Sequence, residues 1–177
     1  MSEKVILVDE TDHVIGIMDK LEAHQKGVLH RAFSIILYKD TRVLLQQRSM
    51  VKYHSAGLWT NTCCSHPREN ESVLDAANRR LMEEMGVQCA LRHSFSFIYK
   101  GALENGLFEH ELDYVLFGEF SGNPILNTDE VSAFEWVEWK ELLTMVDKDP
   151  AKFTLWFKIL LREYKEQIEN ELKHENL

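Results

Sequence analysis

The most informative stretch for the fold runs Ser65-His66-Pro67-Arg68-Glu69-Asn70-Glu71 and resumes after seven residues as Arg79-Arg80-Leu81-Met82-Glu83-Glu84-Met85-Gly86-Val87. Between Ser72 and Met85, apolar side chains recur every fourth residue, as on one face of an α-helix. Ser72 with Asp75 is typical of a capping box, and Gly86 suits the left-handed residue that follows a helix. The sequence therefore predicts a helix over 72–85.

This stretch resembles the Nudix box, whose pattern is G-x5-E-x7-R-E-U-x-E-E-x-G-U with U an apolar residue. The spacing agrees throughout, but Ser65 replaces the glycine and Arg80 replaces the first glutamate of the R-E pair. That glutamate helps to assemble the magnesium site of Nudix hydrolases, so Arg80 weakens a hydrolase interpretation. A guanidinium there could instead bind phosphate oxygens, leaving Glu84 for one Mg²⁺. Taken alone, the charges on this helix could equally form surface ion pairs.

Outward from the helix, residues 31–38 and 43–47 read as a β-hairpin, and further strands are expected at 94–99, 113–120 and 134–139. The last 25 or so residues carry apolar side chains at fourfold spacing, which predicts one amphipathic C-terminal helix. No linker or repeat divides the chain, so we expect a single catalytic domain over 1–177. The fold class is α/β of the α+β type: a Nudix-like mixed β-sheet sandwiched between helices.

Composition narrows the possible partners. The chain has 177 residues and a net charge of −9, which opposes binding to nucleic acid or to an anionic membrane. Three cysteines, two of them adjacent, do not form a disulfide framework, and no apolar run is long enough to span a membrane. We therefore expect a cytoplasmic monomer that captures any anionic ligand in a local cationic site.

Two further segments carry a more specific resemblance. The segment 59–67, with Thr60-Asn61-Thr62-Cys63-Cys64-Ser65-His66-Pro67, matches the T-N-x-x-C-S-H-P signature of the type 1 isopentenyl diphosphate isomerases, and 109–114 matches their E-H-E-x-D-Y segment. With other residues in matching order, the resemblance runs from about residue 5 to residue 160. It implies an isomerase of isoprenoid biosynthesis that interconverts isopentenyl diphosphate and dimethylallyl diphosphate. The reaction is a 1,3-allylic proton shift through a tertiary carbocation.

Five side chains are candidate metal ligands. By resemblance they hold the family's divalent metal: His24, His30, His66, Glu109 and Glu111. From the residues alone, three imidazoles and two carboxylates suit Mn²⁺, Zn²⁺ or a magnesium substitute, although a lone E-x-E is more often an acidic surface stripe. The other five histidines receive structural or surface assignments: His13, His54, His93, His110 and His174.

Three residues are candidate catalysts. Glu111, assisted by Tyr99, is expected to deliver a proton to the alkene, and Cys64 to remove one from the opposite face. Metal charge near Cys64 is expected to lower its thiol pKa from about 8.5. Cys64 could instead be only a small buried hydrophobe, as we assign Cys63 and Cys89. A further alternative is the nucleophile of a cysteine hydrolase, for which the sequence has no recognisable activating or oxyanion arrangement.

The remaining candidates bind the substrate. Trp156 could offer its ring face to the carbocation or simply anchor the terminal helix. The diphosphate is expected to be held by Mg²⁺ on Glu84 together with four cations: Lys20, Arg48, Lys52 and Arg80. Two other functions stay open, a Nudix diphosphate hydrolase and a non-catalytic domain that binds a phosphorylated ligand.

Overall fold

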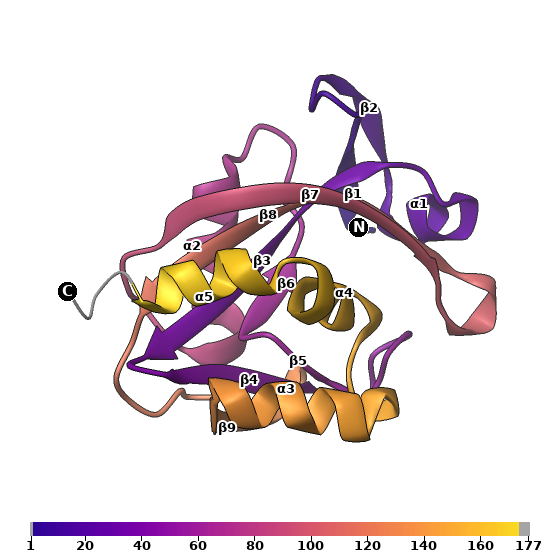
Figure 1. Ribbon diagram of the computed structural model, residues 1–177. Helices are drawn as coiled ribbons and strands as arrows, with labels where there is room; N and C mark the ends of the chain where they lie inside the picture. Colours follow the sequence, from indigo (N-terminus) through magenta and orange to yellow (C-terminus); the bar gives the residue numbers. More distant parts are fainter. Residues whose placement is uncertain (1, 174–177) are drawn as a thin grey trace.

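The structure, a computed structural model, describes residues 2–173, and its central feature is one curved mixed sheet (Figure 1). Within these residues the strands are β1 (Lys4–Val8), β2 (Val14–Asp19), β3 (His30–Lys39), β4 (Arg42–Arg48), β5 (Trp59–Thr60), β6 (Cys63–Ser65), β7 (Arg92–Ala102), β8 (Phe108–Glu119) and β9 (Val131–Glu138). The helices are α1 (Lys20–Lys26), α2 (Val73–Met85), α3 (Trp139–Lys148), α4 (Leu155–Glu163) and α5 (Lys165–Lys173).

Strand β3 organises the sheet. It pairs in parallel with β8 along most of its length, and β8 continues antiparallel to β7. On its other side, β3 pairs antiparallel with β6 in its middle and with β4 at its end. Because β3 borders both β6 and β8, it brings the 63–65 and 109–111 segments together from distant parts of the sequence.

The predicted helix and hairpin are confirmed. Helix α2 spans Val73–Met85, the Ser72 hydroxyl accepts a hydrogen bond from the backbone N–H of Asp75, and Gly86 ends the helix in the left-handed region at φ 62°. Strands β3 and β4 form the hairpin, paired from Leu37↔Leu44 to Lys39↔Arg42.

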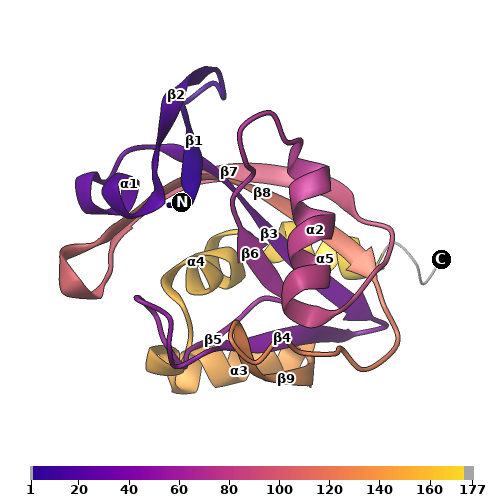
Figure 2. The ribbon, with the colours of Figure 1, turned by 180° about the vertical axis from the view of Figure 1, so that it is seen from behind.

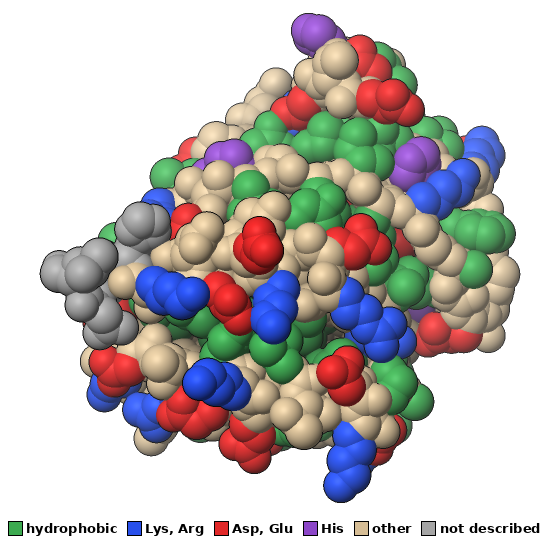
Figure 3. All heavy atoms as spheres, viewed as in Figure 1, with side chains coloured by type: hydrophobic (Ala, Val, Ile, Leu, Met, Phe, Trp, Pro, Cys, Tyr) green, Lys and Arg blue, Asp and Glu red, His purple; other side chains and the backbone are tan. Residues whose placement is uncertain are grey.

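Helices cover both faces of the sheet, as predicted. Helix α2 packs on one face through Ala77, Leu81 and Met85, whereas α4 and α5 cover the other (Figures 1 and 2). Acidic and basic side chains are interspersed over α3 and α5 on the face shown in Figure 3. No helix in the described part of the chain is long and apolar enough to span a membrane.

The prediction of one C-terminal helix is wrong. The segment forms two helices, because Tyr164 leaves the helical region at φ −117° and ψ 22°. The Tyr164 ring stacks on Phe95 of β7, with ring centroids 5.4 Å apart, and lies 4.5 Å from the centroid of Phe97. Because the chain bends here, α4 and α5 can each bury an apolar side against the curved sheet. One straight helix would lose contact with the sheet at one end.

Candidate active site

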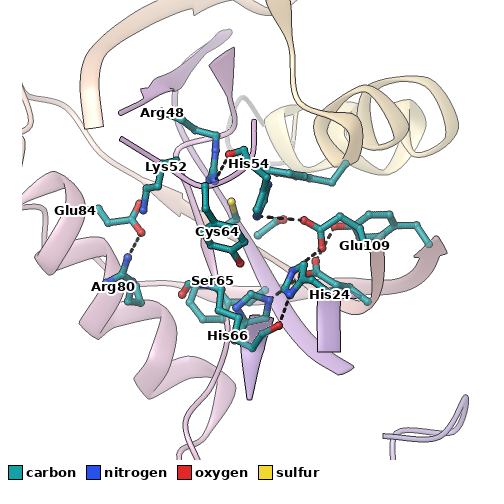
Figure 4. Close-up of a pocket in the computed structure, with 17 residues that line it drawn as sticks. His24, Arg48, Lys52, His54, Cys64, Ser65, His66, Arg80, Glu84 and Glu109 are labelled. Atoms are coloured by element: carbon teal, nitrogen blue, oxygen red, sulfur yellow. Dashed lines mark hydrogen bonds and ion pairs between the residues drawn. The ribbon is translucent and has the colours of Figure 1, made fainter. Parts of the chain in front are cut away.

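The predicted site residues meet in one pocket (Figure 4). Twelve of the thirteen line it, namely Lys20, His24, Arg48, Lys52, Cys64, His66, Arg80, Glu84, Tyr99, Glu109, Glu111 and Trp156. The thirteenth, His30, is fully buried beneath its wall and contacts Glu111. The pocket has two ends, one of histidines and carboxylates and one of cations.

Local structure positions the ligands at the histidine end. Gly27 ends α1 in the left-handed region at φ 62°, which returns the chain so that His24 and His30 lie close, with ring centroids 5.0 Å apart. The β3–β8 register places His30 directly opposite Glu111. On β8, Glu109 and Glu111 project from the same side because they are two residues apart.

These five side chains are in mutual contact and almost entirely buried. The Nε2 atoms of His66 and His30 lie 2.8 and 3.4 Å from Glu111 Oε1. His24 Nε2 lies 3.1 Å from Glu109 Oε2. The alternative of an acidic surface stripe is therefore excluded, since Glu109 and Glu111 are only 2% and 8% exposed.

The donor atoms fit a divalent cation. The ligand atoms of His24, His30, His66 and Glu111 all lie within 4.8 Å of one another. The Nδ1 atoms of His24 and His30 face the carbonyl oxygens of Lys20 and Val28, at 2.7 and 2.8 Å, which directs each Nε2 inward. Both Nε2 atoms, and Oε2 of Glu109, are buried without a hydrogen bond, as metal ligands would be.

The charge balance of this cluster also favours a cation. Burial and the charge of Glu111 raise the pKa of Glu109 to about 7. For Glu111, burial works in the same direction, but its contacts with His30 and His66 outweigh it and hold the pKa well below its usual value. Two carboxylates held this close repel each other when both are ionised, and a bound divalent ion removes that penalty.

The candidate catalysts line the same pocket on different strands. The Tyr99 hydroxyl donates a 2.7 Å hydrogen bond to Glu111 Oε2 across the β7–β8 pairing. Cys64 lies on β6, opposite Ser34 of β3. Glu111 of β8 lies opposite His30, which precedes Ser34 by four residues on β3. Strand β3 thus separates the Cys64 thiol from the Glu111 carboxylate.

The protein groups around Cys64 favour its neutral form. Burial raises the pKa of its thiol to about 12, and Arg48 opposes this rise only in part. The lowered pKa that the sequence predicted depends on the charge of a bound metal ion, whereas among the protein groups alone desolvation of the thiolate is the larger effect. The chain by itself therefore holds Cys64 as a neutral thiol.

At the cationic end, basic side chains surround Glu84. The carboxylate of Glu84 is 5% exposed, is paired with Arg80, and accepts a 3.0 Å hydrogen bond from Gln46 Nε2. Lys52 pairs with Glu130, which lies 3.4 Å from Arg80 Nη2. Lys20 reaches the pocket from α1, with its Nζ 3.0 Å from Glu3.

The position of Trp156 is compatible with both interpretations of its role. Its indole is 3% exposed and belongs to the core that α4 forms with the sheet, while its ring also lines the pocket. The guanidinium carbon of Arg48 lies 5.3 Å from the ring centroid. The Trp156 Nε1–H donates a 3.2 Å hydrogen bond to Asn61, which fixes the orientation of the indole.

Sequence reasoning missed several residues that line the pocket or contact the side chains that line it. Glu130 and Gln46 stand out only as partners of Arg80, Lys52 and Glu84, and no motif contains them. His54, to which we assigned a structural role, lines the pocket beside Glu109, and burial with the charge of Arg48 lowers its pKa to about 3. His174 lies outside the described residues.

Comparison with known proteins agrees with this geometry. A family model described as the NUDIX domain matches residues 28–157. Isopentenyl-diphosphate Delta-isomerase 2 of Aromatoleum aromaticum is 52% identical over 157 residues, covering 88% of this chain and 83% of that protein. The protein of the same name from Photorhabdus laumondii is 49% identical, covering 91% and 92%.

Solved structures show the same fold at lower identity. The MutT protein from Methanosarcina mazei superposes with a TM-score of 0.64 at 17% identity, covering 82% of this chain and 96% of that one. A MutT NUDIX hydrolase from Burkholderia pseudomallei superposes with a TM-score of 0.60 at 24% identity, covering 79% and 98%. These identities are informative about the fold alone.

Proposed function

This chain belongs to the Nudix family and, within it, to the isopentenyl-diphosphate Delta-isomerases, and we propose that it interconverts isopentenyl diphosphate and dimethylallyl diphosphate. The observation that supports this most directly is the placement of Cys64 and Glu111 on strands that flank β3, in a pocket whose other end is cationic. We further propose that residues 1–177 act as one catalytic domain in the cytoplasm, consistent with three free cysteines.

The reaction needs an acid and a base at different carbons of one substrate. Toward dimethylallyl diphosphate, the Glu111 carboxyl gives its proton to the terminal methylene, and the tertiary cation forms. The Cys64 thiolate then takes a proton from the allylic carbon, and the electron pair of that C–H bond becomes the new double bond. Each turnover thus moves one proton onto Cys64 and leaves Glu111 ionised.

The protonation states that burial favours for Cys64 and Glu111 match one of the two states of this reaction. A neutral Cys64 and an ionised Glu111 are what forward turnover leaves behind, and they are the state ready for the reverse reaction. Before the next forward turnover, Cys64 must therefore lose this proton and Glu111 must gain one. Tyr99, whose own pKa burial raises well above its usual value, keeps its proton and holds the carboxylate in place.

The histidine end supports the acid. We propose that His24, His30, His66, Glu109 and Glu111 hold a divalent metal, with Mn²⁺ as one candidate. When bound, such an ion supplies positive charge that stabilises the two neighbouring carboxylates. The pocket walls exclude water from the carbocation. The face of the Trp156 ring stabilises the cation by a cation–π interaction of about 2 kcal/mol or more when desolvated.

The cationic end holds the diphosphate without cleaving it. Arg80, Lys52, Arg48 and Lys20 offer nitrogen donors, and Glu84 offers one buried carboxylate for Mg²⁺ shared with the substrate, an arrangement common for this ion. The pairing of Lys52 with Glu130 and of Arg80 with Glu84 keeps these two side chains in place before the substrate arrives.

Two other functions are the alternatives against which the proposed function is tested. A Nudix hydrolase would need a carboxylate at position 80, where Arg80 stands, and would release phosphate from nucleoside diphosphate derivatives. A domain that only binds a phosphorylated ligand would return its ligand unchanged. Neither function requires Cys64, Tyr99 and Glu111 to share one pocket.

The deciding experiment is incubation of the protein with isopentenyl diphosphate and Mg²⁺ in D₂O. We expect one solvent deuterium in a methyl group of each new dimethylallyl diphosphate molecule, seen by proton NMR and mass spectrometry, with no phosphate released. The proton comes from Glu111, which exchanges with solvent between turnovers. Free phosphate, or unchanged substrate after prolonged incubation, contradicts the proposed function.

Replacing Arg80 by glutamine should raise the KM for isopentenyl diphosphate about 10- to 100-fold with a much smaller effect on kcat. The reason is that a hydrogen bond to a charged group contributes about 1.5–3 kcal/mol, and this one is made to the substrate's unreacting end. Steady-state kinetics measures the change. Arg79→Gln is the matched control, because Arg79 pairs with Glu71 outside the pocket; an equal rise in both variants would count against a phosphate contact.

A further inference from the structure

His54 lies on the segment between β4 and β5, and its ring forms part of the pocket wall. The side chain is 6% exposed. The ring stacks on that of His24, with centroids 5.7 Å apart and planes inclined by 29°. A histidine with only a packing role would not need to stack on the ring of a candidate metal ligand.

The orientation of the ring selects one nitrogen. His54 Nδ1 lies 3.2 Å from the Ser55 hydroxyl, which leaves Nε2 facing the pocket. There Nε2 is 3.9 Å from Glu109 Oε1, and Figure 4 shows the two side chains pointing toward each other. Arg48 fixes the backbone at His54, since its Nη2 donates a 3.2 Å hydrogen bond to the His54 carbonyl.

The described residues contain two groups of possible metal ligands, and His24 belongs to both. One group is His24, His30, His66 and Glu111, and the other is His24, His54 and Glu109. Within each group the ligand atoms all lie within 4.8 Å of one another. His24 has one nitrogen to offer, because its Nδ1 faces the Lys20 carbonyl. An ion bound by both groups would therefore be one ion, held through His24 Nε2.

We propose that His54 is a ligand of this ion and completes a shell of six protein side chains, four imidazoles and two carboxylates. The inference rests on the metal centre of the proposed function. Opposite ligands of an octahedral ion stand about 4.2 Å apart, so the spacing within each group is close to that of a coordination shell, and ion binding must draw the two groups together. A complete protein shell leaves the ion no position for substrate, and it favours transition metals over Mg²⁺.

The test uses Cd²⁺, a diamagnetic probe that accepts six ligands, added to the full chain labelled with nitrogen-15 in histidine. In the wild type we expect four imidazole rings whose Nε2 resonances shift and couple to cadmium. His54→Gln should show three such rings and a dissociation constant for Cd²⁺ raised about 10- to 100-fold. His93→Gln is the matched control, because His93 is exposed and its ring faces Ser96.

The number of rings in the wild type is itself decisive, so the test does not depend on the folding of the variant. Three rings in the wild type would overturn the assignment of His54, as would a fourth ring that persists in His54→Gln. Isomerase activity is assayed separately on the protein as purified. Full activity with only three coordinated rings would support the proposed function and overturn only the assignment of His54 as a metal ligand.

Discussion

Cys64→Ala should lower the rate of conversion of isopentenyl diphosphate by about 10³-fold or more, the range typical of a lost general acid or base. The Cys64 thiolate accepts the proton from the allylic carbon, and no other cysteine lines the pocket among the described residues. The measurement is the appearance of dimethylallyl diphosphate by proton NMR.

The same variant should retain part of the chemistry. Glu111 can still protonate the terminal methylene, and the cation can return a proton from the same carbon. In D₂O, deuterium should therefore enter the recovered isopentenyl diphosphate faster than dimethylallyl diphosphate forms. Loss of both processes would mean that Cys64 takes part in the first proton transfer, contrary to the assigned role.

Another cysteine provides the control for this experiment. Cys89 is half-buried against the core beneath α2 and does not line the pocket. Cys89→Ala should keep turnover near that of the wild type at a small cost in stability. Circular dichroism and thermal unfolding of both variants separate lost chemistry from lost folding.

Glu111→Gln should abolish both isomerisation and deuterium exchange, with a loss of about 10³-fold or more. The amide cannot give or take the proton, although it can still accept the hydrogen bond from Tyr99. It also removes the negative charge that His30 and His66 face, so metal affinity should fall about 10- to 100-fold. Turnover and metal content are measured on the same preparation.

Two further variants show which property of Glu111 matters. Glu111→Asp keeps the charge but withdraws the carboxylate, so it should retain metal better than Glu111→Gln while remaining slow. Glu135→Gln, on the exposed side of β9, should leave both properties unchanged. Robust turnover in Glu111→Gln would transfer the role of acid to another group, of which Tyr99 is the nearest.

Much of the fold could be predicted from local sequence. The fourfold apolar spacing and the caps at Ser72 and Gly86 defined helix α2, because the helix ends are satisfied by residues next to them in the chain. The β3–β4 hairpin was equally local. Helices α1 and α3 and the β1–β2 hairpin were not predicted, since their amphipathic patterns are short or weak and tertiary packing stabilises them.

The site was predictable only as a set of residues. The motifs around Cys64 and Glu111 carry a specific resemblance, and every residue named from it lines the pocket or contacts it. The motifs say nothing of residues outside them, so Glu130 and His54 were missed. Their roles depend on which side chains face them, and that is a property of the folded chain.

The amino-acid order alone determined the helix after Glu71, the hairpin before it and the chemical types of the candidate ligands, because helix caps and apolar periodicity act over a few residues. Only the folded structure decided that Tyr164 interrupts the last helix, that Cys64 is a neutral thiol and that His54 approaches Glu109. Burial and charge act through space, and β3 sets both by pairing with β6 on one side and β8 on the other.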